Sequence, residues 1–170
     1  EGPPSPGNPN KTFVLERKIT EVFLHHGYHE VVTYSFTSPS SWDSIGLAPD
    51  DPRRSHLRIL NPLTEDLSVM RTTLVPGLLE AVRYNLSRKN PNLKLFELKK
   101  VFLPQGGEKL PKEVKYLAGL AMGMERDFHW ASPSRPIDFF DIKGCMEDLL
   151  EVLQIKGVKF VYAEDIPYLH

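Results

Sequence analysis

Cysteine is almost absent from this chain, in which Cys145 is the only one among 170 residues. A disulfide framework and a cysteine-ligated zinc site are therefore both excluded. No apolar run approaches the ~20 residues that cross a bilayer, so we expect no membrane segment. The N-terminal sequence EGPPSPGNPNK lacks the basic and apolar regions of a secretory signal peptide. These absences together fit a reducing, cytoplasmic setting.

An excess of charge of either sign is also missing, because 21 basic and 22 acidic residues leave a formal net charge of −1. The chain therefore has no global positive field that would point to nucleic acid. Hydrophobic residues make up 41% and charged residues 25%, which is ordinary for a globular domain. The first residue is Glu1 rather than Met, and we expect the chain to be a piece of a longer protein.

Residues 1–11 are rich in proline, glycine and asparagine and are predicted to form a linker before one folded module, residues 12–170. Apolar residues at helical spacing predict these helices: Thr12–His26, a short one near Ser40–Ile45, Thr73–Lys89 and Ile142–Leu153. β-Branched, aromatic and alternating residues predict these extended segments: Glu30–Phe36, Leu57–Leu60, Leu67–Thr72, Leu93–Leu103, Tyr116–Met124 and Val158–Tyr162. The sum is an α+β domain with a largely antiparallel sheet and helices packed against it.

Three histidines close together, His25, His26 and His29, have the composition of a metal site, because zinc takes three or four such ligands. Gly27 interrupts the predicted helix between them, so a shared helix face is not expected to persist. The favoured interpretation is a polar helix end, where imidazoles interact favourably with the helix dipole. The sequence therefore predicts no metal site.

Carboxylates gather around the start of the last predicted helix: Asp138, Asp141, Glu147 and Asp148. A paired acid–base role needs one carboxyl group with a raised pKa, and the sequence carries no sign of one. Asp138 and Asp141 are instead predicted to cap the free N–H groups of that helix. Glu147 and Asp148 lie off its apolar stripe and are predicted to be solvated.

Basic residues are concentrated between positions 83 and 100, where they could hold phosphates. The candidate RNA or phosphate contacts are Arg83, Arg88, Lys89 and Lys94. Glu80 and Glu97 dilute this charge, which is also spread over a helix and a strand, so a solvated face is the favoured interpretation.

Three aromatic residues in loops could anchor a partner, namely Trp42, Phe128 and Trp130. The alternative that we favour is that they close over the ends of the sheet. Cys145 lies on the apolar stripe of the last predicted helix, where core packing is expected.

Four segments together resemble the β subunit of bacterial phenylalanyl-tRNA synthetases, and they come in the order seen in that family. They are Gly27–Phe36, Asn61–Lys89, Leu93–Pro104 and Asp138–Leu150. The resemblance spans most of the chain from Lys11 onward. It implies a class II synthetase-like fold, in which helices flank an antiparallel sheet. It also implies a catalytic-like module whose chemistry is carried out by the α subunit.

The resemblance assigns roles to two units of this module. The helix Thr12–His26 with its following strand resembles the first class II motif, which in this family belongs to the interface with the α subunit. The candidate interface residues on that helix are Leu15, Ile19, Val22 and Phe23. The predicted hairpin after Leu93 resembles the second motif, in which an arginine on the first strand clamps ATP. Leu103 stands where that arginine is sought, and a side chain without a planar cationic fork cannot make bidentate phosphate contacts.

The third, glycine-rich motif with its second arginine is not found before His170, so the resemblance implies a core without catalytic residues. It also implies no cofactor in this piece, with ATP and magnesium used by the whole enzyme, an α/β heterotetramer that charges tRNA(Phe). Two alternatives remain open. One is a degenerate core that still binds ATP or an amino acid through Arg71, Lys99 and Lys100. The other is direct tRNA contact through the basic stretch 83–100.

Overall fold

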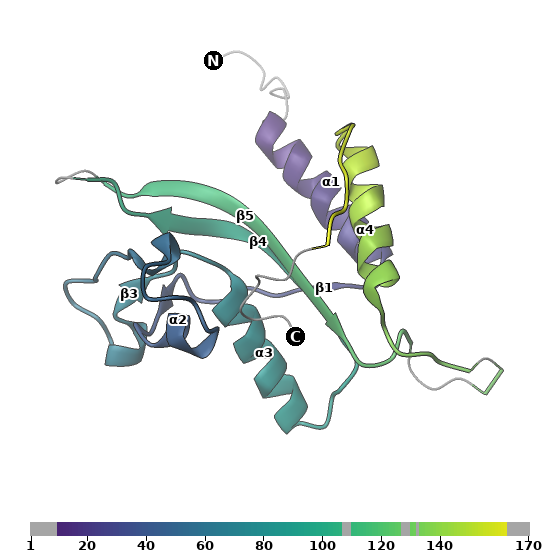
Figure 1. Ribbon diagram of the computed structural model, residues 1–170, viewed down its shortest axis with the longest axis horizontal. Coiled ribbons are helices and arrows are strands. Elements are labelled where there is room, and N and C mark those ends of the chain that lie inside the picture. The colour runs from purple at the N-terminus through teal and green to yellow at the C-terminus, as the bar shows by residue number, and fades with distance from the viewer. Residues whose placement is uncertain (1–9, 107–109, 127–129, 132, 163–170) are drawn as a thin grey trace, which may run out of the picture.

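A three-stranded sheet in the order β1–β4–β5 forms the centre of the molecule (Figure 1). The computed structural model describes residues 10–106, 110–126, 130–131 and 133–162. β4 (Leu93–Leu103) and β5 (Lys112–Met122) pair antiparallel over all 11 residues, and β1 (His29–Glu30) pairs in parallel with β4. The long hairpin confirms the predicted α+β class with its largely antiparallel sheet.

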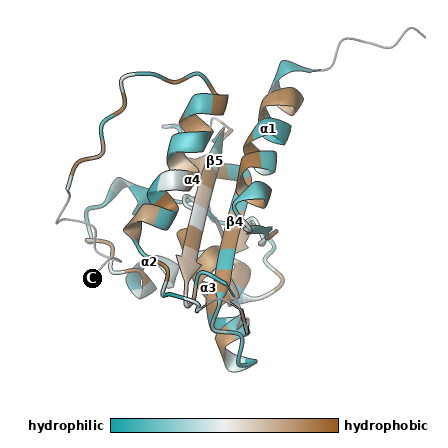
Figure 2. Ribbon diagram, turned by 90° about the vertical axis from the view of Figure 1, so that its right-hand side faces the viewer, coloured by the Kyte–Doolittle hydropathy of each residue, from teal (hydrophilic) through white to brown (hydrophobic). Residues whose placement is uncertain are grey.

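Helices cover both faces of this sheet. α1 (Lys11–His25) and α4 (Phe139–Val152) lie side by side on one face, and α3 (Val75–Ser87) lies on the other (Figure 1). Side chains alternate along a strand, so Phe96 packs with α1 whereas its neighbour Leu95 packs with α3. β4 and β5 therefore carry hydrophobic residues over much of their length (Figure 2).

The core on the α1 side is aromatic at its centre. It consists of Ile19, Val22, Phe23, Tyr28, Phe96, Cys145 and Leu149. Phe23 stacks on Phe96 with 4.8 Å between ring centroids and meets Tyr28 edge-on at 5.1 Å. Cys145 is 1% exposed within this cluster, so it is a core residue as predicted, and its burial raises the pKa of the thiol to about 11.

Tyr28→Phe is expected to reduce the alkaline loss of stability. Burial, and to a smaller extent the charges of Cys145 and Asp141, raises the pKa of Tyr28 from 10.0 to about 12. Between pH 10 and pH 12 only the unfolded chain ionises at this residue, so the stabilisation present below pH 10 is lost through that window. Urea unfolding should show a shallower decline for Tyr28→Phe and no change near neutral pH. Tyr162→Phe, at a side chain that is 88% exposed, should keep the full decline, and equal curves for both variants would contradict the assignment.

A smaller lobe joins α3. It contains α2 (Ser41–Ser44), 3-10 turns at Pro52–Arg54 and Glu65–Leu67, and the antiparallel strands β2 (Phe36–Thr37) and β3 (Val69–Met70). Trp42 is buried at its centre, donates its indole N–H to Thr72 Oγ1 at 3.0 Å and stacks on His56. Trp42 is therefore a core residue of this lobe rather than a cover over the end of the central sheet, and Trp130 is 88% exposed. Phe128 lies outside the described residues.

The prediction of one continuous strand over Glu30–Phe36 is wrong. β1 ends at Glu30 and β2 begins at Phe36, and the segment between them leaves the ladder. The reason is a side chain, because Thr33 donates its backbone N–H to the Glu97 carboxylate at 3.0 Å rather than to a backbone carbonyl of β4. Leu57–Leu60 is likewise reduced to one bridge, between Arg58 and Val69.

Val158–Tyr162 is not a strand either, because it pairs with no strand within the described ranges. It runs along α4 instead, where the Lys143 ammonium lies 5.4 Å from the centre of the Phe160 ring. β5 begins four residues before the predicted Tyr116 because β4 offers backbone partners as far as Leu103, and it ends before Gly123, whose φ is +86°. No helix of the described chain has the length and apolar content needed to cross a bilayer.

Candidate functional site

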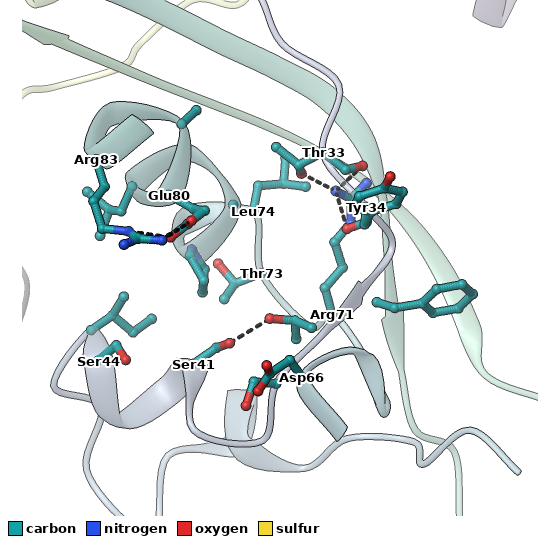
Figure 3. A pocket seen from close by; sticks show the side chains of 18 of the residues that line it. Thr33, Tyr34, Ser41, Ser44, Asp66, Arg71, Thr73, Leu74, Glu80 and Arg83 are labelled. Atoms are coloured by element: carbon teal, nitrogen blue, oxygen red, sulfur yellow. Dashed lines mark hydrogen bonds and ion pairs between the residues drawn. The ribbon is translucent and has the colours of Figure 1, made fainter. Parts of the chain in front are cut away.

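A groove of about 1140 Å³ lies between α3, α2 and the extended segment 31–38 (Figure 3). One wall is the segment 31–38, and the opposite wall is the side of α3 that carries Pro76, Glu80 and Tyr84. Hydroxyl groups of α2 and apolar side chains also line it. Arg71, one of the candidate ATP-binding cations, is among the residues that line this groove.

A buried ion pair anchors this floor. Arg71 Nη1 lies 3.0 Å from Glu97 Oε1, and the two side chains are only 6% and 0% exposed. Thr33 completes the cluster, since its backbone N–H donates to one Glu97 oxygen and its hydroxyl to the other at 2.8 Å. Arg71 Nε also donates to the backbone carbonyl of Lys100 at 3.0 Å. Removing either partner of such a pair would leave an uncompensated buried charge. Because Thr33 bonds to the same carboxylate, the cluster also attaches the segment near Thr33 to β4.

The close approach of α3 to this cluster depends on Gly77. A Cβ atom at position 77 would lie 2.6 Å from Thr33 Oγ1, well inside contact distance. Pro76 lies in the first turn of α3, where a backbone N–H has no partner within the helix, so the missing N–H of proline is tolerated. The pair Pro76-Gly77 therefore both starts the helix and lets it lie against Thr33.

The candidate interface residues on α1 fall into two environments. Ile19, Val22 and Phe23 are 9%, 7% and 3% exposed and pack on the sheet and α4, because this stripe is the helix's own contribution to the core. Leu15 is 46% exposed. Two further apolar residues of this helix, Phe13 and Leu24, are exposed on its outer face. They were not among the predicted interface residues.

The outer face of α1 has a sequence signature of its own. Phe13 is 62% exposed and Leu24 is 51% exposed. They are 11 residues apart, which is close to three helical turns, so they share one face of α1. This spacing could have identified them, but the more regular core stripe dominates the pattern.

The candidate RNA contacts do not form one surface. Arg83 pairs with Glu80, with 2.9 Å between Nε and Oε2, and this hydrogen bond lowers the pKa of Glu80. The Arg88 guanidinium lies 3.4 Å over the Tyr84 ring. Lys94 lies on the opposite face of the sheet, where Nζ donates to the backbone carbonyl of His26 at 3.3 Å. Lys89 follows the end of α3 with a φ of 62°. Of these four cations, only Arg88 and Lys89 are neighbours, and they are consecutive residues at the C-terminal end of α3.

The candidate ATP-binding cations are also separated. Arg71 is held by Glu97, and Lys100 Nζ lies 2.5 Å from Glu113 Oε2 across the hairpin. Lys99 is half-buried in β4 opposite Tyr116. Leu103 ends β4 opposite Lys112, so the hairpin carries no arginine at the position where the resemblance places the clamp.

The histidines do not converge. His26 Nε2 lies 2.7 Å from Asp148 Oδ2, which ties the end of α1 to α4. His25 Nδ1 lies 2.7 Å from the carbonyl of Glu21 on its own helix, and His29 is exposed in β1. Over the described ranges, no group of three or more His, Cys, Asp or Glu residues is arranged to hold a metal ion.

The carboxylates at the start of α4 form a capping box, as predicted. The Asp138 side chain accepts from the N–H groups of Phe140 and Asp141, and the Asp141 side chain accepts from the Asp138 N–H. A side-chain hydrogen bond from Arg135 is the main reason that the pKa of Asp141 falls to about 2. This is the opposite of the raised pKa that a general acid needs. Glu147 pairs with Lys143 at 2.9 Å along the helix.

In sequence, this chain is similar to the β chains of phenylalanyl-tRNA synthetases. The family model described as "Phenylalanyl tRNA synthetase beta chain CLM domain" matches residues 1–170. Similar proteins include phenylalanine–tRNA ligase β subunits from Geobacter metallireducens, 43% identical over 92% of this chain, and Symbiobacterium thermophilum, 44% identical over 79%. The chain covers 20% and 15% of these relatives, so it spans about a fifth of their length or less.

Two solved structures of pyrrolysyl-tRNA synthetase from Desulfitobacterium hafniense share the fold. Their TM-scores are 0.64 and 0.61, and both are 18% identical in sequence. The alignments cover 92% and 89% of this chain, and 52% and 48% of those chains. The likeness confirms the predicted class II synthetase-like fold.

Proposed function

This chain belongs to the family of phenylalanyl-tRNA synthetase β chains, and we propose that it is a non-catalytic module that docks the catalytic α subunit. The complex charges tRNA(Phe) with phenylalanine in an ATP-dependent reaction in the cytoplasm. In this proposal the module holds no ATP or magnesium of its own. It meets tRNA through the complete assembly.

The observation that carries the proposal is the state of the cations around the β4–β5 hairpin. A class II core needs an arginine fork free to grip phosphates. Here Leu103 ends β4. Arg71 forms an ion pair with the buried Glu97 carboxylate, and Lys100 forms one with Glu113. Among the described residues, the hairpin therefore offers no free arginine fork to a nucleotide.

The exposed apolar side chains of α1 support docking. Phe13 and Leu24 lie on the face of α1 that turns away from the sheet, and they are 62% and 51% exposed. Exposed apolar patches often mark protein contact sites, where aromatic residues supply much of the binding energy. This outer face of α1 gives the first class II motif an apolar surface beyond the core stripe.

Light scattering coupled to size exclusion tests the docking. The chain mixed with the cognate α subunit is expected to elute as one defined complex, and separate elution would contradict docking. The double variant Phe13→Asp, Leu24→Asp should weaken the complex by about tenfold or more, equivalent to ~1.4 kcal/mol. Leu60→Asp is the control, because Leu60 is 96% exposed on a different loop.

ATP–pyrophosphate exchange tests the absence of catalysis. The chain alone is expected to show no phenylalanine-dependent exchange, while the α subunit with its complete partner does. Exchange by the chain alone would overturn the non-catalytic assignment and favour the degenerate core that binds ATP.

A further inference from the structure

The C-terminal end of α3 carries two exposed cations that have no carboxylate partner. Arg88 and Lys89 follow directly on α3, and neither forms an ion pair with any described residue. The chain has no Asp or Glu between Glu80 and Glu97. Glu80 is paired with Arg83, and Glu97 is fully buried. The charges of Arg88 and Lys89 are therefore uncompensated, at the end of a helix that lies across the sheet from α1 and α4 (Figure 1).

Arg88 is held in place by an aromatic ring rather than by a carboxylate. Its guanidinium carbon lies 3.4 Å from the centre of the Tyr84 ring, and Nη1 donates to the Tyr84 carbonyl and to Ser87 Oγ at 3.4 Å each. A guanidinium stacked in this way keeps its full charge and its planar fork. No described residue accepts a hydrogen bond from Nε or Nη2 of Arg88. These two donors are therefore available to an anion while the ring fixes their orientation.

The negative end of the helix dipole does not cancel these charges. The Asn85 carbonyl accepts hydrogen bonds from the N–H groups of Arg88 and Asn90, at 2.9 and 3.1 Å. The Leu86 carbonyl accepts one from Lys89 at 2.9 Å. Even without these bonds, the carbonyl groups of a helix end carry the equivalent of about half a negative charge. Two full positive charges exceed it, so this corner of the molecule is positive at short range.

We propose that Arg88 and Lys89 bind phosphates of the tRNA backbone, and that Tyr84 positions the Arg88 guanidinium for this contact. An arginine fork matches two oxygens of one phosphate, while a lysine acts as a point charge on a neighbouring one. The Tyr84 ring is 55% exposed beside these cations, and aromatic rings next to positive charge are typical of surfaces that bind single-stranded nucleic acid. The inference rests on the proposed function, because tRNA is the polyanion on which the proposed complex acts.

Only part of the basic stretch 83–100 takes part in this contact. The Arg83 guanidinium is neutralised by Glu80, with 2.9 Å between Nε and Oε2. Lys94 lies on the opposite face of the sheet, where it donates to a backbone carbonyl. The contact is therefore limited to the two cations after α3, and it leaves α1 free to dock the α subunit.

Fluorescence anisotropy of a labelled tRNA(Phe) transcript, titrated with the whole chain, tests the contact. The double variant Arg88→Ala, Lys89→Ala is expected to weaken binding by about tenfold. It should also reduce the slope of log K against log salt by about 1.4–1.8, because each phosphate contact contributes about 0.7–0.9. Lys156→Ala, Lys159→Ala is the matched control, since it removes the same charge from two exposed lysines beyond α4. Equal losses in both double variants, or no binding by the unmodified chain, would overturn the proposal.

Single variants separate the roles of the side chains from the stability of the fold. Lys89→Gly suits the backbone, whose φ is 62° at this position, so it should raise the urea midpoint. The same variant is expected to weaken tRNA binding by about threefold, and unchanged binding would contradict the proposal. Tyr84→Leu should also weaken binding by about threefold, whereas Tyr84→Phe keeps the ring and should bind like the unmodified chain. Equal losses in both Tyr84 variants would contradict the positioning role.

Labelled poly-L-glutamate tests an acidic protein segment as the alternative ligand. We expect it to bind more weakly than the tRNA transcript. If it binds more tightly, and Arg88→Ala, Lys89→Ala removes that binding, the assignment to RNA fails. The tRNA titration needs no α subunit, so a failure of the RNA contact and a failure of α-subunit docking are separate results.

Discussion

Replacing Glu97 with alanine is expected to lower the free energy of unfolding by about 3–5 kcal/mol, because it leaves the Arg71 guanidinium buried without its counter-ion. The carboxylate is 0% exposed and accepts hydrogen bonds from Arg71 and from both the backbone and the side chain of Thr33. Urea unfolding followed by the fluorescence of buried Trp42 measures the change.

Glu113→Ala is the matched control for this loss. Glu113 lies on the neighbouring strand β5 and pairs with Lys100, but the two side chains are 48% and 51% exposed. An exposed pair contributes about 0–1 kcal/mol, so this variant should remain close to the unmodified chain. The double variant Arg71→Met, Glu97→Met should recover part of the loss, because it removes both charges at once. If Glu97→Ala costs no more than Glu113→Ala, the buried pair does not hold the segment near Thr33.

Gly77→Ala is expected to destabilise the fold by about 2 kcal/mol, although alanine is the better helix former. The added Cβ would lie 2.6 Å from Oγ1 and 3.0 Å from Cβ of Thr33. Thr33 has little freedom to move away, because Glu97 and Arg71 both bond to its hydroxyl. The overlap must therefore shift α3 or the segment 31–35, and thermal or urea unfolding should detect the cost.

Gly144→Ala is the control that measures the effect of helix propensity without a steric overlap. Gly144 lies within α4, and a Cβ atom there would have nothing within 4 Å. This change should stabilise the chain by about 0.5–1 kcal/mol, which is the ordinary gain in a helix. Stabilisation by both glycine variants would show that α3 does not depend on close contact with Thr33.

The helices and the central hairpin could be predicted from the sequence because their signals are local. The apolar spacing in α1, α3 and α4 matches one helix turn after another, and β4 begins with a clear alternation. Pro76 also marks the start of α3, since proline is tolerated only in the first turn. Where the signal depends on neighbours within a dozen residues, the predicted elements agree with the structure.

Two of the three strands that were predicted wrongly show that strand formation depends on distant partners. Thr33 leaves the ladder because of Glu97, which is 64 residues away in the chain. Val158–Tyr162 has the composition of a strand but runs along α4. β-Propensity describes how a side chain suits a pleated surface, and it does not say whether a partner strand is present.

The candidate site could likewise be predicted only in part from local sequence patterns. The resemblance pointed to the first helix as an interface element, but composition does not distinguish the stripe that packs on the chain's own sheet from the one that faces outward. Ile19, Val22 and Phe23 are in the core, and Phe13 and Leu24 are exposed. Glu97 looked like a charge that dilutes a basic surface, whereas it is fully buried. A single acidic residue within an otherwise apolar stretch of strand was the available signal, and its partner Arg71 is 26 residues away.

The attachment of residues 31–35 to β4 has a mechanical consequence. A backbone ladder spreads load over many hydrogen bonds, while this segment, after one backbone bond from Val31 to Phe96, is secured to β4 through the hydroxyl and N–H of Thr33 on one carboxylate. Beyond Val31, a pull on the segment therefore reaches β4 through the Glu97 side chain. The same pull reaches the backbone of Lys100 through the guanidinium of Arg71. The segment can accordingly yield as one unit, while the hairpin behind it keeps its eleven-residue register.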